Sequence, residues 1–347
     1  MRITENYSGG NIRVLKTEGD TVFLDNEMRD SVGSWFYWAF RAESAQGRRI
    51  RFVFNRCMVG YWGAAVSRDG RNWRWSGNAD HDGTGFTYTF GEDEDTVYFC
   101  HDMNYPFERF LDFAEEKKLH LTSLTTSEGG RDVPMVHIGT EGPALLLTSR
   151  HHCCESPGTY FLEGMLREFT EHPPMGFRVL AVPFMDLDGA VSGDQGKNRA
   201  PHDHNRDYID TPVWNSTAAL MRLAPQENVQ YHLDLHAPDH RYFEHDYVYL
   251  LRSPDNDNEL RETFSRLLEE ETLAHREAFP FCHRFAFDRA GSTPGTCVHW
   301  FSRLPGMKLS AAIESTYAGN YYRKVSTDNL TALGACAARA MRKIIGG

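Results

Sequence analysis

The sequence predicts an α/β fold in which a mixed, mostly parallel sheet is flanked by helices and is preceded by an antiparallel β-sandwich. Two features of the 347-residue chain lead to this prediction. Before residue 120 the apolar runs are short, aromatic and partly alternating, with turn signals between them, as in a sandwich. After residue 120 apolar runs of strand length alternate with helical patterns, as in an α/β domain. We therefore expect an N-terminal β-sandwich domain with a connecting helix at 1–119 and a second domain at 120–347.

Four aromatic runs predict the sandwich, and they are "WFYWAFRAE", "RRIRFVFN", "GFTYTFGE" and "TVYFCHD". Turn signals such as "RDGRN" and "DHDGTG" separate them, and five of the seven tryptophans lie in this part of the chain. We expect these aromatic residues to form a packed core rather than a carbohydrate-binding platform. The next segment, "YPFERFLDFAEEKKL", predicts the connecting helix, with Phe107, Phe110, Leu111 and Ala114 on one face.

Four apolar runs in the second part predict buried strands, and they are "PALLLTS" (143–149), "FRVLAVPFM" (177–185), "VQYHLDL" (229–235) and "MKLSAAI" (307–313). Helical patterns lie between them, among them "SPGTYFLEGMLREF" and "NELRETFSRLLEEETLAHRE". Ser156 is the expected N-cap of the first of these helices, with Pro157 at its first helical position.

Polar side chains follow each of the four predicted strands. In an open α/β sheet, sites collect beyond the carboxyl ends of the strands, so these side chains are expected to share a cleft. Two histidines with a carboxylate, and a further glutamate, suit a catalytic zinc with an open coordination position. In chain order the residues are His151, His152 and Glu155, then Asp186 and Asp188, then Asp234 and His236, and finally Glu314.

The stretch "HHCCE" supplies the first two expected ligands. The spacing His152-x-x-Glu155 lets one tight turn offer an imidazole and a carboxylate to the same ion, and His151 is the alternative ligand. Cys153 and Cys154 stand between them, but adjacent cysteines are not the C-x-x-C of a redox pair.

Composition narrows the range of partners. The formal net charge of −11 at pH 7 argues against a nucleic acid or an anionic membrane as the main partner. The N-terminal segment has no apolar stretch typical of a signal peptide, and no run approaches the roughly 18 apolar residues that span a bilayer. Seven cysteines without regular spacing indicate reduced thiols. We therefore expect a soluble, acidic protein of the cytoplasm.

In their order along the chain, these motifs resemble the zinc metallocarboxypeptidases, and specifically their cytosolic carboxypeptidase branch. That family has H-x-x-E, a turn similar to N-P-D-G, an N-R pair, a histidine after a buried strand and a late glutamate. The corresponding segments are "HCCE" (152–155), "DLDG" (186–189), "HDHNRDY" (202–208), "LDLHA" (233–237) and "AAIES" (311–315). "TTSEGGRDVPMVHIG" and "WFYWAFRAESAQGRRIRF" resemble the start of the family's catalytic domain and the sandwich before it. The resemblance thus covers nearly the whole chain.

The resemblance implies a carboxypeptidase-like catalytic domain at 120–347 that binds one zinc ion per chain through His152, Glu155 and His236. Glu314 would be the general base that deprotonates the attacking water. The implied reaction is hydrolysis of the C-terminal residue of a peptide or a protein tail, with no nucleic-acid or membrane partner.

The resemblance also implies an anchor and an oxyanion partner. Asn205 and Arg206 would hold the free α-carboxylate of the substrate, because a planar guanidinium can donate two parallel hydrogen bonds. Where the family has an arginine that stabilises the oxyanion, a gapless match places Gly196, with Lys197 next to it and Arg199 three residues on. We favour Arg199 on donor geometry, with Lys197 as the alternative.

Selectivity in the family is set largely before the catalytic glutamate, here in "GTCVHWFSRLPGMKLSAAIE". His299 and Arg303 are possible cations there, and Trp300 and Phe301 are possible apolar walls, so we expect an acidic or aromatic terminal residue. The family's mobile tyrosine has no counterpart, because residues 250–313 contain no tyrosine.

Three other interpretations stay open. His202, His204, His240 and His245 could form a second metal site, although we expect solvated loop histidines. The same anchor could hold an N-acyl amino acid, which would make the protein an amidase or deacylase. A binding or scaffold protein could keep the fold without the chemistry, although a scaffold has no need of an open metal position.

Overall fold

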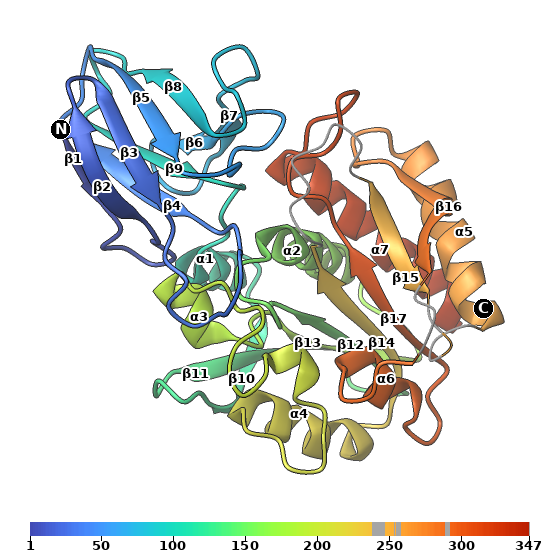
Figure 1. The fold of residues 1–347 in the computed structure, drawn as a ribbon. Coiled ribbons are helices and arrows are strands. Elements are labelled where there is room, and N and C mark those ends of the chain that lie inside the picture. The colour runs from blue at the N-terminus through green and yellow to red at the C-terminus, as the bar shows by residue number, and fades with distance from the viewer. Residues whose placement is uncertain (238–246, 253, 255–257, 289–291, 347) are drawn as a thin grey trace.

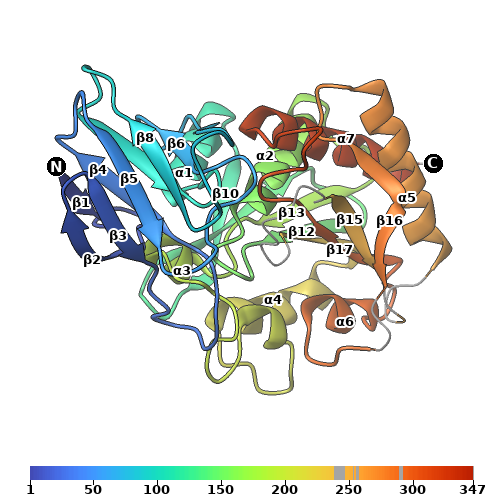
Figure 2. The same cartoon turned by 45° about the horizontal axis from the view of Figure 1, so that its top comes forward.

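The computed structural model describes residues 1–237, 247–252, 254, 258–288 and 292–346. The chain forms two parts that lie side by side (Figures 1 and 2). The N-terminal part is built of two small sheets, and the C-terminal part of one large sheet with helices on both faces. Within the described residues, no helix is both long enough and apolar enough to cross a membrane.

The two small sheets pack face to face over an aromatic core. One has the strand order β1-β4-β9-β6-β7 and the other β2-β3-β5-β8. Trp38 stacks on Phe86 with 5.9 Å between ring centroids, and Phe40 stacks on Phe99 at 5.1 Å. The aromatic runs therefore form a packed core, as predicted. The strands are β1 (Arg2–Thr4), β2 (Arg13–Glu18), β3 (Thr21–Asp25), β4 (Ala39–Glu43), β5 (Arg49–Phe54), β6 (Ala65–Ser67), β7 (Arg74–Trp75), β8 (Gly85–Thr89) and β9 (Thr96–Cys100).

The sandwich departs from the antiparallel expectation at one pair. β3 and β5 are parallel neighbours in the four-stranded sheet. In the sequence, β4 comes between β3 and β5 and belongs to the five-stranded sheet. The chain then returns to the four-stranded sheet, where β5 runs in the same direction as β3. The other sandwich pairs among the described residues are antiparallel.

The connecting helix is α1 (Phe107–Glu116), which buries Phe110, Phe113 and Ala114. The helix is confirmed, but its buried face differs from the predicted one, because Leu111 is 42% exposed and Phe113 takes its place.

The large sheet has the order β10-β11-β13-β12-β14-β17-β15-β16. The central pairs β13–β12, β12–β14 and β14–β17 are parallel, as is β15–β16, whereas β10–β11, β11–β13 and β15–β17 are antiparallel. The mixed, mostly parallel sheet is therefore confirmed, and the four predicted buried strands are β12, β13, β14 and β17. The strands are β10 (His120–Thr126), β11 (Asp132–Ile138), β12 (Ala144–Ser149), β13 (Arg178–Val182), β14 (Val229–His236), β15 (Val248–Arg252), β16 (Phe281–Asp288) and β17 (Leu309–Glu314).

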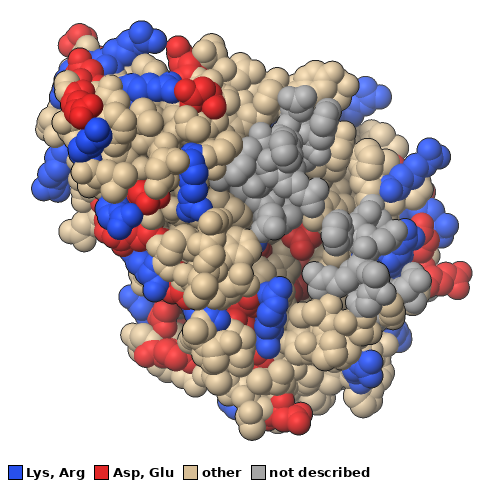
Figure 3. Space-filling model, viewed as in Figure 1, with Lys and Arg blue, Asp and Glu red and all other residues tan. Residues whose placement is uncertain are grey.

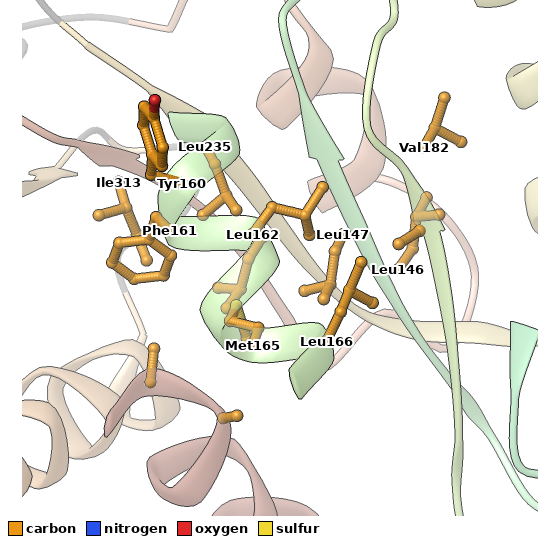
Figure 4. Close-up of a cluster of buried hydrophobic side chains, with 14 of the residues drawn as sticks. Leu146, Leu147, Tyr160, Phe161, Leu162, Met165, Leu166, Val182, Leu235 and Ile313 are labelled. Atoms are coloured by element: carbon orange, nitrogen blue, oxygen red, sulfur yellow. The ribbon is translucent and has the colours of Figure 1, made fainter. Parts of the chain in front are cut away.

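Helices cover both faces of this sheet. α2, α5 and α7 lie on one face, and α4 and α6 lie on the other (Figures 1 and 2). Figure 4 shows Phe161, Leu162 and Met165 of α2 packed among Leu147 and Ile313 of the sheet, all with 0–1% exposure. Full burial of each such side chain contributes about 1.5–3 kcal/mol. The helices are α2 (Ser156–Glu171), α3 (Leu187–Ser192), η1 (His204–Arg206, a 3-10 turn), α4 (Asn215–Gln226), α5 (Glu259–Ala274), α6 (Cys297–Ser302) and α7 (Thr327–Gly346).

The start of α2 differs from its prediction. Glu155 occupies the N-cap and makes no side-chain cap bond, and Ser156 is already helical. The hydroxyl of Ser156 instead accepts hydrogen bonds from Arg150 Nη1 at 2.6 Å and from the backbone N–H of Tyr105 at 3.1 Å. These buried contacts tie the start of the helix to the segment before α1.

The sandwich lies against the carboxyl ends of the central strands. Ala237, directly after β14, and Tyr317, shortly after β17, are buried in the sandwich's own apolar core. The N-terminal part therefore covers the carboxyl ends of the central strands, where the polar residues lie. Figure 3 shows a hollow between the two parts with acidic side chains inside it.

Candidate active site

Three side chains converge at the carboxyl ends of β12 and β14. His152 and Glu155 lie in the turn between β12 and α2, and His236 is the last residue of β14. The Nδ1 atoms of His152 and His236 each lie 2.8 Å from an oxygen of Glu155, His152 from Oε1 and His236 from Oε2. Ligand atoms of all three residues lie within 4.8 Å of one another. The structure thus brings together the three predicted metal ligands.

This set of donors fits a zinc ion. Two imidazole nitrogens and a carboxylate are a common set in catalytic zinc sites, where one position stays open for water or substrate. Both Nδ1 atoms face the same carboxylate, and Glu155 is 1% exposed, so the three side chains are held around one point.

His151, the alternative ligand, faces other partners. Its Nδ1 atom lies 2.8 Å from Oδ1 of Asp234, and its Nε2 atom lies 2.7 Å from the hydroxyl of Tyr208. It can join Asp234 and His236 in a second group of potential ligand atoms, but neither of its nitrogens faces Glu155. His152 therefore remains the predicted ligand, and His151 lies behind the cluster.

Two aspartates lie behind the predicted histidine ligands, and one of them is within hydrogen-bond distance of its histidine. Oδ2 of Asp234 lies 2.8 Å from Nε2 of His236, and Oδ1 of Asp203 lies 3.6 Å from Nε2 of His152. Carboxylates in this place fix the tautomer and the ring orientation of a metal-binding histidine. Neither aspartate was assigned a role from the sequence, although a signal was present for Asp234. Asp234 and His236 are two residues apart on a strand and so point to the same face.

In this cluster, neighbouring opposite charges shift the pKa values of Glu155 and His236 by more than burial does. Burial alone would raise the pKa of Glu155, but Lys197, His152 and His236 together lower it well below its usual value. Burial alone would lower the pKa of His236, but Asp234 and Glu155 raise it well above the usual value. A bound metal ion would take the place of protons on the histidines, as metal ligands require.

Glu314 ends β17 and is paired with His236 in the register of β14 and β17. Its Oε2 atom is buried and makes no hydrogen bond within the described part of the chain. Burial and the neighbouring charge of Glu155 raise the pKa of this carboxyl, although His236 and Lys197 oppose them. A carboxylate with a raised pKa beside a metal ligand is suited to general-base work.

The two predicted oxyanion partners lie in different surroundings. Lys197 places its Nζ atom 2.6 Å from Oε1 of Glu155, and its side chain is 8% exposed. The guanidinium of Arg199, which we favoured from the sequence, is instead enclosed by carboxylates at 2.9–3.3 Å. It is therefore Lys197 that reaches the ligand cluster. The carboxylates around Arg199 are those of Asp30, Asp186 and Asp194.

Gly196 explains the departure from the family pattern at this point. Its φ is +71°, and a Cβ atom there would lie 2.5 Å from the backbone nitrogen of Cys153. No side chain fits at this position without moving the turn that carries His152. The next residue, Lys197, instead places a cation at this point.

The predicted anchor pair lies on η1. Arg206 is 47% exposed in its side chain and pairs with Oδ2 of Asp203 at 2.7 Å. Asn205 accepts a hydrogen bond from the backbone N–H of Cys297 at 3.3 Å. Burial alone would raise the pKa of Asp203, but His152 and Arg206 lower it below its usual range. Asp203 thus lies between the predicted anchor and one predicted metal ligand.

The additional histidines form no second cluster where they are described. His202 lies 2.6 Å from Oδ1 of Asp207, and the ring of His204 stacks on Trp214 at 4.5 Å. Burial lowers the pKa of His204 to about 4. Neither belongs to a group of potential ligand atoms within the described residues. His240 and His245 lie outside the residues that the structure describes.

The two adjacent cysteines are buried thiols. Cys153 donates to the backbone oxygen of Asp194 at 3.2 Å, and burial raises the pKa of Cys154 to about 12. A thiol with a raised pKa is a poor nucleophile and a poor redox group. Their place is in packing between the two parts of the chain.

A cavity of about 410 Å³ lies beside the anchor segment and is lined by His299, Trp300 and Arg303, among others. These are three of the four residues predicted to set selectivity. Phe301 is instead fully buried, with its ring stacked on His232 at 4.0 Å.

Comparisons with known proteins agree with the resemblance that was predicted from the order of the motifs. No family model matches the chain. It is 23% identical to an uncharacterized protein of Zymomonas mobilis over 63% of this chain and 62% of that protein. It is 22% identical to cytosolic carboxypeptidase 2 of Xenopus tropicalis over 68% of this chain, and 23% identical to that of Danio rerio over 87%. The matched regions span only 27% and 49% of those two relatives.

Solved structures match over nearly the whole chain. The metallo-carboxypeptidase from Burkholderia cenocepacia has a TM-score of 0.84 at 19% identity and covers 99% of each chain. The metallo-carboxypeptidase from Pseudomonas aeruginosa, in complex with (2-guanidinoethylmercapto)succinic acid, has a TM-score of 0.82 at 20% identity, covering 100% of this chain and 99% of that one. The resemblance of this chain to the metallo-carboxypeptidases, predicted from the order of its motifs, is therefore confirmed, and the fold is theirs.

Proposed function

We propose that the protein is a zinc metallocarboxypeptidase, an enzyme that hydrolyses the C-terminal residue of a peptide or a protein tail. The observation that carries the proposal is the convergence of His152, Glu155 and His236 at one edge of the sheet, with Glu314 paired to His236 in register. Curated relatives named cytosolic carboxypeptidases and solved structures named metallo-carboxypeptidases support it.

One zinc ion per chain would be held by His152, Glu155 and His236, and when bound it supplies a Lewis acid that polarises the scissile carbonyl and activates water. Glu314 takes the proton from the attacking water and later passes it to the leaving amine. The raised pKa of its carboxyl brings the group closer to the operating pH and so favours both transfers.

Lys197 takes the place that the sequence analysis gave to Arg199. Its ammonium is largely buried beside Glu155. The low dielectric there strengthens the attraction between this positive charge and a developing oxyanion. Arg199 keeps a structural function, because its donors are held by three carboxylates.

Arg206 and Asn205 hold the α-carboxylate of the substrate in the proposed mechanism. Arg206 is exposed toward solvent and yet fixed by Asp203, so its position is set before substrate arrives. The neighbouring cavity is lined by His299, Arg303 and Trp300, and also by Asp210, and in this proposal it takes the side chain of an acidic or aromatic terminal residue.

We propose the cytoplasm as the site of action. All seven cysteines are free, and free buried thiols persist in a reducing compartment. The net charge of −11 supports a peptide or protein tail as partner, rather than a nucleic acid or a membrane.

The proposal is tested with zinc-loaded protein and a panel of peptides that differ in their last residue, each with a free and with an amidated C-terminus. Mass spectrometry should show loss of one residue from the free peptides and none from the amidated ones. Equal cleavage of both forms would refute a carboxypeptidase. Cleavage of N-acyl amino acids alone would indicate a deacylase, and peptide binding without cleavage would indicate a scaffold.

A further inference from the structure

The loop 193–199 carries Lys197 to the metal ligands, and it lies between the large sheet and the sandwich. Its backbone packs against the His152–Cys153 turn, as the close approach of Gly196 to Cys153 shows. Gly193 and Gly196 have φ values of +77° and +71°. Glycine adopts many backbone conformations, so a loop with two such residues needs outside contacts to hold one of them.

Asp30 supplies the central contact, and it belongs to the sandwich segment between β3 and β4. Its Oδ1 accepts a hydrogen bond from the backbone N–H of Gln195 at 3.0 Å, and its Oδ2 accepts one from Gly196 at 2.8 Å. Oδ2 also accepts from Nε of Arg199 at 3.1 Å. The carboxylate is 10% exposed and therefore fixes the loop on both sides of Lys197 from a nearly dry position.

Further contacts join the same two segments. The side chain of Gln195 is fully buried and accepts from the backbone N–H of Tyr37 at 2.8 Å, while its Nε2 donates to the backbone oxygen of Tyr37 at 2.9 Å. Ser31 and Arg199 form an antiparallel bridge. Figures 1 and 2 show the segment between β3 and β4 reaching from the sandwich toward α3, where this loop begins.

The sandwich also provides two walls around the lysine. The Nζ atom of Lys197 lies 5.5 Å from the ring centroid of Trp35 and 5.6 Å from that of Phe36. The face of an aromatic ring attracts a cation. Apolar walls also exclude water, which strengthens the field of the ammonium at its target.

We infer that Asp30 is a positioning residue of the active site, which acts through the loop 193–199 to hold Lys197 beside Glu155. The sandwich is then a working part of the catalytic centre and not a separate module. The inference rests on the proposed function of Lys197 as the oxyanion partner. A catalytic group displaced by about 1 Å costs about a hundredfold in rate, so loss of the Asp30 contacts should be visible in turnover.

The first test measures the loop itself. Asp30→Asn removes the charge at nearly constant size, and Asp30→Ala removes every contact. The control Asp20→Asn changes an exposed aspartate of the same sandwich that pairs with Arg48. Amide hydrogen exchange should quicken at least roughly tenfold in residues 194–199 of both Asp30 variants and stay unchanged in the control. Unchanged exchange in Asp30→Ala would overturn the inference, whatever the activity.

The second test measures turnover of the zinc-loaded protein. Asp30→Asn should lower kcat by about 10- to 100-fold, with KM and zinc content within about twofold of wild type. In a Lys197→Ala background the same change should cost less than about threefold, because residues that act through one another are not additive. A full additional loss in that background, or a change in KM alone, would overturn the inference. If wild type cleaves none of the peptides, the proposed function fails, and the exchange measurement still decides whether Asp30 holds the loop.

Discussion

His236 shows at the scale of single residues how the chain fixes a side chain that we propose as a metal ligand. Its Nδ1 atom faces Glu155, and its Nε2 atom faces Asp234. Asp234 is itself fixed by Thr148, whose hydroxyl donates to it at 2.7 Å, and by His151 at 2.8 Å. The ring can therefore neither flip nor swing, and a ligand held in this way loses little entropy when a metal binds.

Replacing a ligand should remove the metal. Wild-type protein should carry one zinc per chain, and His236→Ala should lose it, because two remaining ligands are too few for a tight tetrahedral site. Metal analysis by mass spectrometry measures this. His202→Ala is the matched control, because that histidine contacts Asp207 and not the ligand cluster. Full zinc content in His236→Ala would show that the metal, if any, lies elsewhere.

Replacing the anchor should weaken substrate binding. Arg206→Ala removes a charge-assisted contact to the α-carboxylate, which is worth about 1.5–3 kcal/mol, so KM should rise roughly tenfold to a hundredfold. Zinc content should stay constant, and Arg222→Ala, an exposed arginine on α4, should behave as wild type. An unchanged KM for Arg206→Ala would place the anchor on another residue.

At the scale of elements, the site depends on how α2 packs, because this helix begins directly after Glu155. α2 and α7 cross on glycines. A Cβ atom on Gly164 would lie 1.9 Å from the backbone oxygen of Thr331, and one on Gly334 would lie 1.9 Å from that of Phe161. The backbones of the two helices are therefore in direct contact, which fixes the height of α2 above the sheet.

A methyl group at this crossing should destabilise the protein. Alanine gains about 1 kcal/mol over glycine in helix propensity, but Gly334→Ala drives its Cβ into backbone, and overpacking of this kind typically costs about 1–3 kcal/mol or more. Urea unfolding should therefore show a net loss of stability. Gly346→Ala is the control, because nothing lies within 4 Å of a Cβ there. Equal stability of the two variants would contradict the packing argument.

Elements with a strong local pattern could be predicted from the sequence. The strands β12, β13, β14 and β17 are buried on both faces, so they appear as continuous apolar runs. β15 and β16, at one end of the sheet, were not predicted, because β15 (VYLLR) is a run of only five residues and β16 (FCHRFAFD) mixes polar with apolar residues. The three predicted ligands stand out in the sequence because they lie at or shortly after the carboxyl ends of β12 and β14.

Lys197 and Asp30 could not be chosen from local patterns. Whether the cation at the site is Lys197 or Arg199 depends on Gly196, whose close contact is with Cys153, and on Asp30, more than 160 residues earlier in the chain. Contacts of that range are set by the way the two parts of the chain pack together, and no periodicity in the sequence reports them.

At the scale of the whole molecule, the contact between the sandwich and the large sheet buries ionisable groups. Asp102 follows β9 and is 0% exposed. Burial raises its pKa, and Cys100 and Arg150 lower it by less, so that the pKa rises from 3.8 to about 7. The group is neutral in the folded protein at mildly acidic pH and carries a buried charge above about pH 7.

This shift predicts how stability depends on pH. Because the folded pKa is raised, Asp102 contributes stability that is full below about pH 4 and is lost as pH rises through about 7. The free energy of unfolding of wild type should therefore fall relative to that of Asp102→Asn between pH 4 and 8, by up to about 4 kcal/mol. Urea unfolding at pH 4 and pH 8 measures the difference. A constant difference between the two proteins would mean that Asp102 does not titrate in this range.

The central claim, that this chain cleaves C-terminal residues with Glu314 as its base, is tested most directly by one comparison. The rate of single-residue loss from a free-ended peptide is measured by mass spectrometry for zinc-loaded wild type and for Glu314→Gln. Glutamine keeps the shape and removes the proton acceptor, so the rate should fall at least roughly a hundredfold. Zinc content and peptide affinity should stay unchanged, because Glu314 is neither a ligand nor an anchor in the proposed mechanism. Equal rates for the two proteins would contradict the account.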